Sequence, residues 1–327
     1  MNLYPEVSVV MSAFNSEEFI SESINSILNQ DFKDFEFIII NDGSSDKTLS
    51  IINKYQKIDN RIKVINQKNF GLTKSLNNAV SIAKSNFIAR IDADDISLPS
   101  RLSTQLKYLK SNSNLGFVFS NFIFIDKSGN KIQKKIISTN SYQVRYNLLK
   151  GINNIAHSSV MFRKDLFFEI GKYRNRFKKS QDIDLWIRMT DKYEFSNVGS
   201  EPLILIRNHD NQISRNENDI FKYISILSYL MRKNLRQDPL DLTETEFNRF
   251  FEWIRDYLYF SKEFVKQEKI REFKLFFLDV NFSLNHFSRF FSNVICSKYF
   301  YIIIFEKLVG RSIYNDLYKS WTQKINT

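Results

Sequence analysis

Short apolar runs alternate with amphipathic stretches over the N-terminal third of the chain. The apolar runs are rich in β-branched residues, which is typical of strands buried on both faces of a parallel sheet. They lie at Val7–Met11, Phe35–Ile40, Ile62–Ile65 and Phe87–Ile91. The amphipathic stretches carry apolar residues at helical spacing and lie at Ser16–Asn29, Asp46–Lys57 and Leu72–Lys84. This alternation predicts an α/β fold in which a mostly parallel sheet is flanked by helices.

The pattern changes after about residue 115. An alternating strand is predicted at Phe117–Ile125, and a turn at 126–129 leads to a second strand, Lys131–Ile137, which pairs back as a hairpin. Further strands are predicted at Ser158–Phe162 and Pro202–Arg207, with a helix at Asp182–Thr190. From about residue 216 the pattern is helical and rich in Phe and Tyr. We therefore predict one domain over residues 1–215 and a mostly helical C-terminal region over residues 216–327.

Composition narrows the class of protein. An apolar share of 43% and a charged share of 25% are ordinary for a globular protein. The single cysteine, Cys296, excludes an internal disulfide and a cysteine-built zinc site, and it fits a reducing, cytoplasmic setting. The apolar runs are far shorter than the roughly 20 residues that a membrane-spanning helix needs. We therefore expect a soluble or peripheral protein.

The net charge of +11 lies entirely after residue 110, because residues 1–110 contain equal numbers of basic and acidic side chains. A basic surface can meet nucleic acid, an anionic lipid or a phosphorylated acceptor. The alternative is that these lysines belong to solvated helix faces. Basic and aromatic residues also gather near the C-terminus, at Arg289, Lys298 and Tyr299–Phe305. For the aromatic residues around Phe250, Trp253 and Tyr257, core packing is the interpretation we favour, and the basic and aromatic residues from Arg289 onward suggest contact with an anionic membrane as the alternative.

Polar residues follow the first two predicted strands. In open parallel sheets ligands bind beyond the carboxyl ends of the strands. Asn15 follows the first strand, where it could line a nucleotide pocket or cap the next helix with Glu18. Asp42 stands at the tip of the second strand, where its carboxylate could accept from a base N–H or a ribose hydroxyl. The alternative for Asp42 and Gly43 is a capped turn.

Three carboxylates, Asp92, Asp94 and Asp95, follow the fourth predicted strand. So close together, they would repel one another strongly without a cation. Hard oxygen ligands favour Mg²⁺ or Mn²⁺, usually shared with substrate phosphates. An acidic helix N-terminus is the alternative, but the apolar strand just before the cluster favours a metal site. His209 follows another strand and could complete that site with Asp94.

The segment around residue 182 carries a further candidate. Asp182 lies at a predicted helix start, where it could cap the helix or act as a general base. Asp184 and Arg188 form an i,i+4 pair that we interpret as structural. Trp186 could belong to the core or form a platform for a sugar face.

Four segments, in this order and spacing, resemble the inverting, GT-A enzymes of glycosyltransferase family 2. They are Val7–Asn15, Phe35–Asp46, Arg90–Asp95 and Gln181–Trp186. The resemblance covers roughly residues 5–215. It implies a Rossmann-like nucleotide-diphospho-sugar transferase domain, with a nucleotide-binding half at about residues 1–110 and an acceptor half at about residues 111–215.

The resemblance also implies site residues. The donor would be bound by Ala13, Phe14, Asn15, Asp42, Lys74, Asn77, Asp92 and Ala93. The metal would be bound by Asp94 and His209, Asp182 would be the catalytic base, and His157 and Trp186 would border the acceptor. Three positions depart from the family pattern. Phe14 stands where a Tyr is usual, Asn41 where an Asp is common and Gln181 where a Glu is common, but none of these removes a core catalytic group.

The function implied is transfer of a hexosyl or N-acetylhexosaminyl group from a nucleoside-diphosphate sugar, with UDP-sugar favoured. The acceptor would be a hydroxyl of a saccharide or lipid-linked molecule in cell-surface polysaccharide synthesis, with Mn²⁺ or Mg²⁺ as cofactor and no nucleic-acid partner. A nucleotidyltransferase is the first alternative, but residues 11–18 lack the glycines of a phosphate loop. A basic interaction protein is the second, and it leaves the acidic strand end unexplained.

Overall fold

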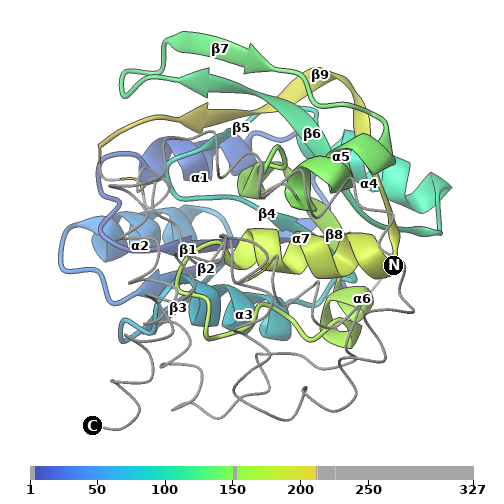
Figure 1. The fold of residues 1–327 in the computed structure, drawn as a ribbon. Helices are drawn as coiled ribbons and strands as arrows, with labels where there is room; N and C mark the ends of the chain where they lie inside the picture. Colours follow the sequence, from blue (N-terminus) through green and yellow to red (C-terminus); the bar gives the residue numbers. More distant parts are fainter. Residues whose placement is uncertain (1–3, 150–152, 211, 213–224, 226–327) are drawn as a thin grey trace, which may run out of the picture. The chain divides into compact units, whose positions relative to one another are not determined.

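The computed structural model describes residues 4–149, 153–210, 212 and 225 (Figure 1). These residues belong to a compact unit that extends from Met1 to Ile226. Apart from Ser225, the predicted C-terminal region 216–327 lies outside the described residues, and so do Cys296 and the residues considered for membrane contact. The domain boundary at residue 215 therefore stays a prediction. Among the described residues, no helix has the length and apolarity to cross a membrane.

In the described part of the chain, one nine-stranded sheet runs in the order β3-β2-β1-β4-β8-β6-β9-β5, with β7 paired to β6. The strands are β1 Val7–Ala13, β2 Phe35–Asp42, β3 Ile62–Gln67, β4 Phe87–Arg90, β5 Ile96–Ser97, β6 Leu115–Ile125, β7 Lys131–Lys135, β8 Met161–Arg163 and β9 Glu194–Arg207. Strands β1 to β4 pair in parallel, and β6 also pairs in parallel with β9. The predicted α/β fold with a mostly parallel sheet is confirmed.

Seven α-helices and one 3₁₀ turn lie between the strands in the described residues (Figure 1). They are α1 Ile20–Leu28, α2 Thr48–Ile58, α3 Leu72–Ile82, α4 Arg101–Ser111, α5 Ser141–Leu149, η1 His157–Ser159, α6 Lys164–Glu169 and α7 Gln181–Lys192. Helices α1 and α2 connect β1 to β2 and β2 to β3, so the chain moves toward one edge of the sheet. Helix α3 then connects β3 to β4, on the other side of β1, so the chain crosses back over the sheet. Right-handed crossovers therefore place α3 on the opposite face, so β1 and β2 are buried on both faces.

Burial of both faces of the sheet explains why the first strands are mostly apolar in sequence. Val9, Phe37 and Ile39 are fully buried in β1 and β2. Ile24 of α1 and Leu76 of α3 are also fully buried. Burying each such side chain contributes roughly 1.5–3 kcal/mol relative to leaving it in water. The buried strands hold the loops at their carboxyl ends in fixed positions.

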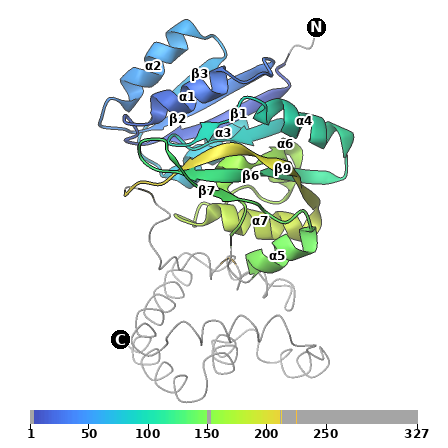
Figure 2. The ribbon, with the colours of Figure 1, turned by 90° about the horizontal axis from the view of Figure 1, so that it is seen from above.

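The second half departs from the predicted pattern in several places. Strand β9 begins at Glu194, whereas the sequence predicted a start at Pro202. The prediction missed the first residues because they show no apolar alternation and are interrupted by Gly199 and Pro202. The predicted strand Ser158–Phe162 is divided into η1 and the short strand β8. The sequence pattern does not predict β5, α5 or α6. The hairpin of β6 and β7 is confirmed, and Figure 2 shows α5 beside α7, in agreement with their contacts.

Candidate active site

Three neighbouring strands end at one edge of the sheet. Strands β2, β1 and β4 are adjacent and parallel, so their carboxyl ends point the same way. Ala13 ends β1, Asp42 ends β2, and the acidic segment begins two residues after Arg90, which ends β4. The structure thus brings the three strand-end segments singled out in the sequence to one edge.

The loop after β1 is tied to the loop after β2 through Asn15. Its Oδ1 accepts a hydrogen bond from the Ser45 backbone N–H at 2.9 Å, and its own N–H donates to Ser44 Oγ at 3.1 Å. Asn15 has a left-handed φ of 47°, and α1 begins only at Ile20, so the capping alternative for Asn15 is wrong. Ala13 is buried, whereas Phe14 is 48% exposed beside this junction. Phe14 therefore presents an aromatic face at the strand-end edge.

Asp42 is buried and holds the loop between β3 and α3. Its Oδ1 accepts from Gln67 Nε2 at 2.8 Å and from the Phe70 N–H at 2.9 Å, and its Oδ2 accepts from the Gly71 N–H at 2.9 Å. A carboxylate has about four acceptor positions, so these bonds leave capacity for a ligand. The structural alternative considered from the sequence was a capped turn after β2, whereas the Asp42 carboxylate holds the β3–α3 loop. Contact of Asp42 with the donor stays a prediction.

The two α3 candidates differ. Lys74 is exposed. Asn77 instead binds the backbone of Tyr173, with Oδ1 accepting from its N–H at 3.1 Å and Nδ2 donating to its carbonyl at 2.8 Å. The Asn77 side chain thus joins α3 to the segment before α7. These contacts therefore give Asn77 a packing role and lend no support to a role in donor binding.

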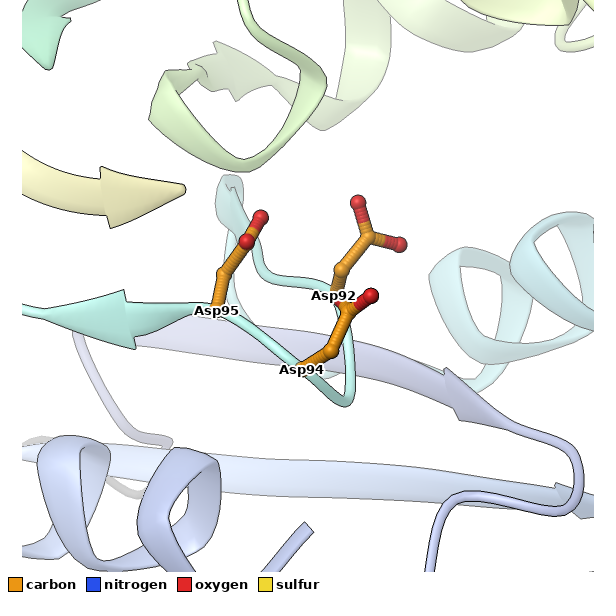
Figure 3. A group of neighbouring side chains, drawn as sticks. All are labelled: Asp92, Asp94 and Asp95. Atoms are coloured by element: carbon orange, nitrogen blue, oxygen red, sulfur yellow. The ribbon is translucent and has the colours of Figure 1, made fainter. Parts of the chain in front are cut away.

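The acidic loop between β4 and β5 gathers three carboxylates. Asp92, Asp94 and Asp95 each offer an oxygen within 4.8 Å of the others, and all three side chains lie on the same side of the loop (Figure 3). A tight turn at Ala93–Asp94 brings them together. Asp95 is buried, while Asp92 and Asp94 are half-buried.

The electrostatics of this loop favour a cation. Burial raises the pKa of Asp94, and the charge of Asp92 adds to the effect. Burial also raises the pKa of Asp95 well above its ordinary value, and repulsion from Asp94 and Asp92 reinforces that. A divalent ion would relieve both penalties, since a nearby positive charge favours the ionised carboxylates. The all-oxygen donor set fits Mg²⁺ or Mn²⁺.

His209 lies against this loop, as expected. Its Nε2 is 2.9 Å from Asp94 Oδ2. The His209 ring also packs against Phe19, with the ring centroids 4.9 Å apart. The sequence therefore predicted a pair that the structure brings together, and their metal-binding role remains a proposal.

Arg90 and Ser158 form a hydrogen-bonded group with Asp92 that sequence reasoning missed. The buried Arg90 guanidinium pairs with the Asp92 carboxylate, and Ser158 Oγ donates to Asp92 Oδ2 at 3.0 Å. The Asp92 backbone N–H donates to Ser158 Oγ, also at 3.0 Å. Burial lowers the pKa of Arg90, but the Asp92 carboxylate more than offsets this and raises it. Asp92 is thus held in place and charge-balanced on the β4 side.

Asp182 lies in the first turn of α7, after Ser180 with a left-handed φ of 52°. Asn153 Nδ2 donates to Asp182 Oδ2 at 3.1 Å. Burial raises the pKa of Asp182 to about 6, with Arg90 lowering it and Asp92 raising it in smaller measure. The charges of Arg90 and Asp92 thus act on the pKa of Asp182 in opposite directions. A carboxylate with this pKa is mostly ionised at neutral pH and is a better proton acceptor than an ordinary aspartate.

His157, in η1, and Trp186, in α7, pack against each other, with their ring centroids 5.9 Å apart. His157 Nε2 lies 2.7 Å from the Tyr173 hydroxyl, and burial with the nearby Arg90 charge lowers the pKa of His157 well below its ordinary value. Trp186 is fully buried and stacks on Phe117 with ring centroids 5.1 Å apart. A buried indole presents no face to a sugar. The structure therefore supports the core interpretation of Trp186 over the acceptor platform.

The other α7 expectation is confirmed. Arg188 Nη2 and Asp184 Oδ2 are 2.7 Å apart, and both side chains are buried. Arg188 also donates to the carbonyls of Ile170 and Lys172. This pair anchors α7 to the preceding loop, and Asp182 in the first turn of α7 takes no part in it.

Two known glycosyltransferases are similar to this chain in sequence. The chain is 37% identical over 243 residues to an uncharacterized glycosyltransferase of Methanocaldococcus jannaschii, covering 70% of this chain and 81% of that protein. It is 33% identical over 235 residues to the O-antigen biosynthesis glycosyltransferase WbnJ of Escherichia coli, covering 71% of this chain and 89% of that protein.

A solved structure has the same fold. A crystal structure of S. aureus TarS in complex with UDP-GlcNAc is similar with a TM-score of 0.59 and 19% identity, covering 76% of this chain and 70% of that chain. At this identity the likeness bears on the fold, and it confirms the predicted GT-A architecture. The model of the Glycosyl transferase family 2 matches residues 8–171, about half of the chain. Because this family model and the sequence relatives both match, and because the strand-end loops and the acidic loop are present, the chain belongs to glycosyl transferase family 2.

Proposed function

We propose that this glycosyltransferase moves a sugar, with inversion, from a nucleoside-diphosphate sugar to a hydroxyl of a saccharide or lipid-linked acceptor. The observation that carries the proposal is the cluster of three carboxylates in the acidic loop, with His209 Nε2 2.9 Å from Asp94 Oδ2. UDP-sugar is the favoured donor because the structurally similar TarS binds UDP-GlcNAc. Cell-surface polysaccharide synthesis is the favoured setting because WbnJ serves O-antigen biosynthesis.

The donor nucleotide would lie at the shared strand-end edge. Phe14 offers an exposed aromatic face there, and Asn15 joins the two loops that would surround the base. Asp42 supports the adjoining loop through the Phe70 and Gly71 backbone. Aromatic rings are suited to stacking on nucleobases because both have extended π faces. Lys74, exposed on α3, would contribute positive charge toward the nucleotide.

Asp94 and His209, with Asp92 and Asp95 beside them, would hold a divalent cation shared with the donor. A bound Mn²⁺ or Mg²⁺ supplies positive charge that offsets the negative charge of the leaving nucleoside diphosphate. Arg90 and Ser158 keep the Asp92 carboxylate oriented. The chain thus fixes the loop before the ligand arrives, which lowers the reorganisation needed on binding.

Asp182 would act as the general base. Its carboxylate removes the proton of the acceptor hydroxyl while that oxygen attacks the anomeric carbon from the face opposite the diphosphate. One carbon–oxygen bond forms, the bond to the diphosphate oxygen breaks, and the nucleoside diphosphate leaves with the bonding electrons. A single displacement inverts the anomeric configuration. Asn153, which donates to Asp182 Oδ2, orients the carboxylate.

A panel of sugar nucleotides tests this function directly. A ligand that binds the folded state raises its apparent stability, so the matching donor should raise the Tm of the purified protein when Mn²⁺ is present. Incubation of that donor with saccharide acceptors should then release the nucleoside diphosphate, and NMR of the product should show the inverted anomer. The absence of any thermal or calorimetric response to nucleoside diphosphates with Mn²⁺ or Mg²⁺ would reject the proposal.

The two alternative functions gain no support. A nucleotidyltransferase needs a glycine-rich phosphate loop, but the β1–α1 connection contains no glycine. A basic interaction protein would have no need for three clustered carboxylates. Contact of the C-terminal region with an anionic membrane stays a prediction, because that region lies outside the described residues.

A further inference from the structure

Arg207 ends β9 and joins three segments that are distant in sequence. Its side chain is buried, with Nε donating to the Asp94 carbonyl at 3.1 Å. One terminal nitrogen donates to the Lys127 carbonyl at 2.8 Å, and the same nitrogen lies 3.4 Å from the Asp126 carbonyl. The other donates to Glu22 Oε2 at 2.6 Å. A single guanidinium therefore links the acidic loop, the β6–β7 turn and α1.

The backbone and aromatic neighbours of Arg207 extend this link. Its N–H donates to Asp95 Oδ1 at 3.0 Å, so two consecutive residues of the acidic loop bind Arg207. Phe19 lies 4.7 Å from the guanidinium and also packs against the His209 ring. His209 follows two residues later and contacts Asp94. Arg207 therefore contacts Asp94 directly, and it shares the neighbour Phe19 with His209.

Arginine suits this place for a physical reason. Its planar guanidinium has five N–H donors in fixed directions, whereas lysine offers three on one flexible atom. A lysine at 207 could not reach Asp94, Lys127 and Glu22 at once. It would leave at least one of these acceptors without its present donor.

We propose that Arg207 is a positioning residue that holds the acidic loop and His209 together as one ligand-binding unit. It would act through Asp94, Asp95 and His209 rather than by touching the reacting atoms. This inference rests on the proposed function, because it assumes that the unit binds a divalent cation with the donor diphosphate. Neither the sequence motifs nor the family resemblance assigned a role to this residue.

Arg207→Lys tests the proposal, with Arg163→Lys as a matched control. Arg163 also donates to backbone carbonyls, those of Leu115 and Leu109. It pairs with Phe87 at the start of β4, at the opposite end of that strand from the acidic loop. Arg163 is half-buried. Both substitutions keep the charge and remove the planar fork, so a general effect of losing an arginine that donates to backbone carbonyls would be shared by the two variants.

Two measurements apply to each full-length variant. Hydrogen exchange with mass spectrometry follows the amides of residues 91–97 and 126–130, and titration calorimetry gives the Kd for Mn²⁺ in the presence of UDP. Arg207→Lys should speed exchange in both segments and weaken Mn²⁺ binding by about 10-fold or more, the range typical for partners of metal ligands. Arg163→Lys should change neither. Glu22→Gln, at an exposed position, should shift both readouts in the same direction by less.

Unchanged exchange in Arg207→Lys would overturn the proposal. Faster exchange with wild-type Mn²⁺ affinity would also overturn it, because the role of Arg207 would then be structural alone. If Arg207→Lys does not fold, wild-type values for both measurements in Glu22→Gln overturn it instead. Failure of the wild-type protein itself to bind Mn²⁺ with UDP would reject the proposed function, an outcome separate from the exchange result.

Discussion

His209 Nε2 lies 2.9 Å from Asp94 Oδ2, although 115 positions separate the two residues in the chain. The contact forms because β9 enters the sheet beside β6 and β5 and ends next to the loop that follows β4. An imidazole nitrogen and a carboxylate oxygen at this separation can both turn toward one cation. The fold of the second half therefore completes a site that begins in the first half.

Substitution of this pair should weaken metal binding. Asp94→Ala removes a carboxylate oxygen from the cluster, and His209→Ala removes the nitrogen beside it. We expect each variant to bind Mn²⁺ with UDP at least about 10-fold more weakly, and Asp94→Ala to lose transfer activity. Titration calorimetry measures the first effect and donor turnover the second.

Asp59→Asn is the control for this prediction. Asp59 binds Arg61 in the loop before β3, at the amino end of that strand and away from the acidic loop. Its substitution should leave the Kd for Mn²⁺ at the wild-type value. Wild-type Mn²⁺ affinity in both Asp94→Ala and His209→Ala would show that the cation binds elsewhere.

The sequence predicts the first half of the fold and the acidic loop well. Continuous apolar strands such as Phe35–Ile40 are recognisable because helices cover both faces of the sheet there. Asp92 and Asp94 are recognisable because three carboxylates after a buried strand are electrostatically costly. These signals are local, so a single sequence displays them.

The sequence cannot reveal roles that depend on long-range packing. Arg207 becomes notable only when the fold brings Asp94 and Glu22 to it. The sequence predicted Asn77 as a nucleotide ligand, but the structure pairs it with Tyr173. For Trp186 the sequence left both a core position and a sugar platform open, and its stack on Phe117 favours the core. In each case the deciding contact joins segments whose relative position the local pattern does not encode.

Asp182→Asn should separate catalysis from binding. The amide keeps the size and hydrogen-bonding capacity of the side chain but cannot take a proton. We expect kcat to fall by about 10²–10⁴-fold, the usual contribution of a general base, while the Kd for UDP with Mn²⁺ changes little. Asp165→Asn, at an exposed position on α6, serves as the control. Full transfer activity in purified Asp182→Asn would remove this residue from the base role.

The pH dependence of kcat should carry the signature of the same residue. Burial raises the pKa of Asp182 from 3.8 to about 6. Because a base works only when deprotonated, kcat should rise with pH through about 6 and level off above it, falling roughly tenfold per pH unit on the acidic side. Asp182→Glu should retain an acidic limb, and the residual activity of Asp182→Asn should lack it. A flat wild-type profile down to about pH 5 would contradict this assignment.

Gly43→Ala should damage the donor edge through its backbone. Gly43 has a φ of 77°, and a Cβ there would lie 2.6 Å from the Asn69 backbone nitrogen, in the loop that Asp42 supports. Left-handed backbone alone costs an alanine about 1–2 kcal/mol, and the clash adds displacement of that loop. Gly129→Ala is the matched control, because its φ is 89° but a Cβ would meet nothing within 4 Å. Urea unfolding should therefore show a larger loss in the free energy of unfolding for Gly43→Ala than for Gly129→Ala, and UDP binding should weaken in Gly43→Ala alone. Equal losses of stability in the two variants would mean that the contact with Asn69 is unimportant.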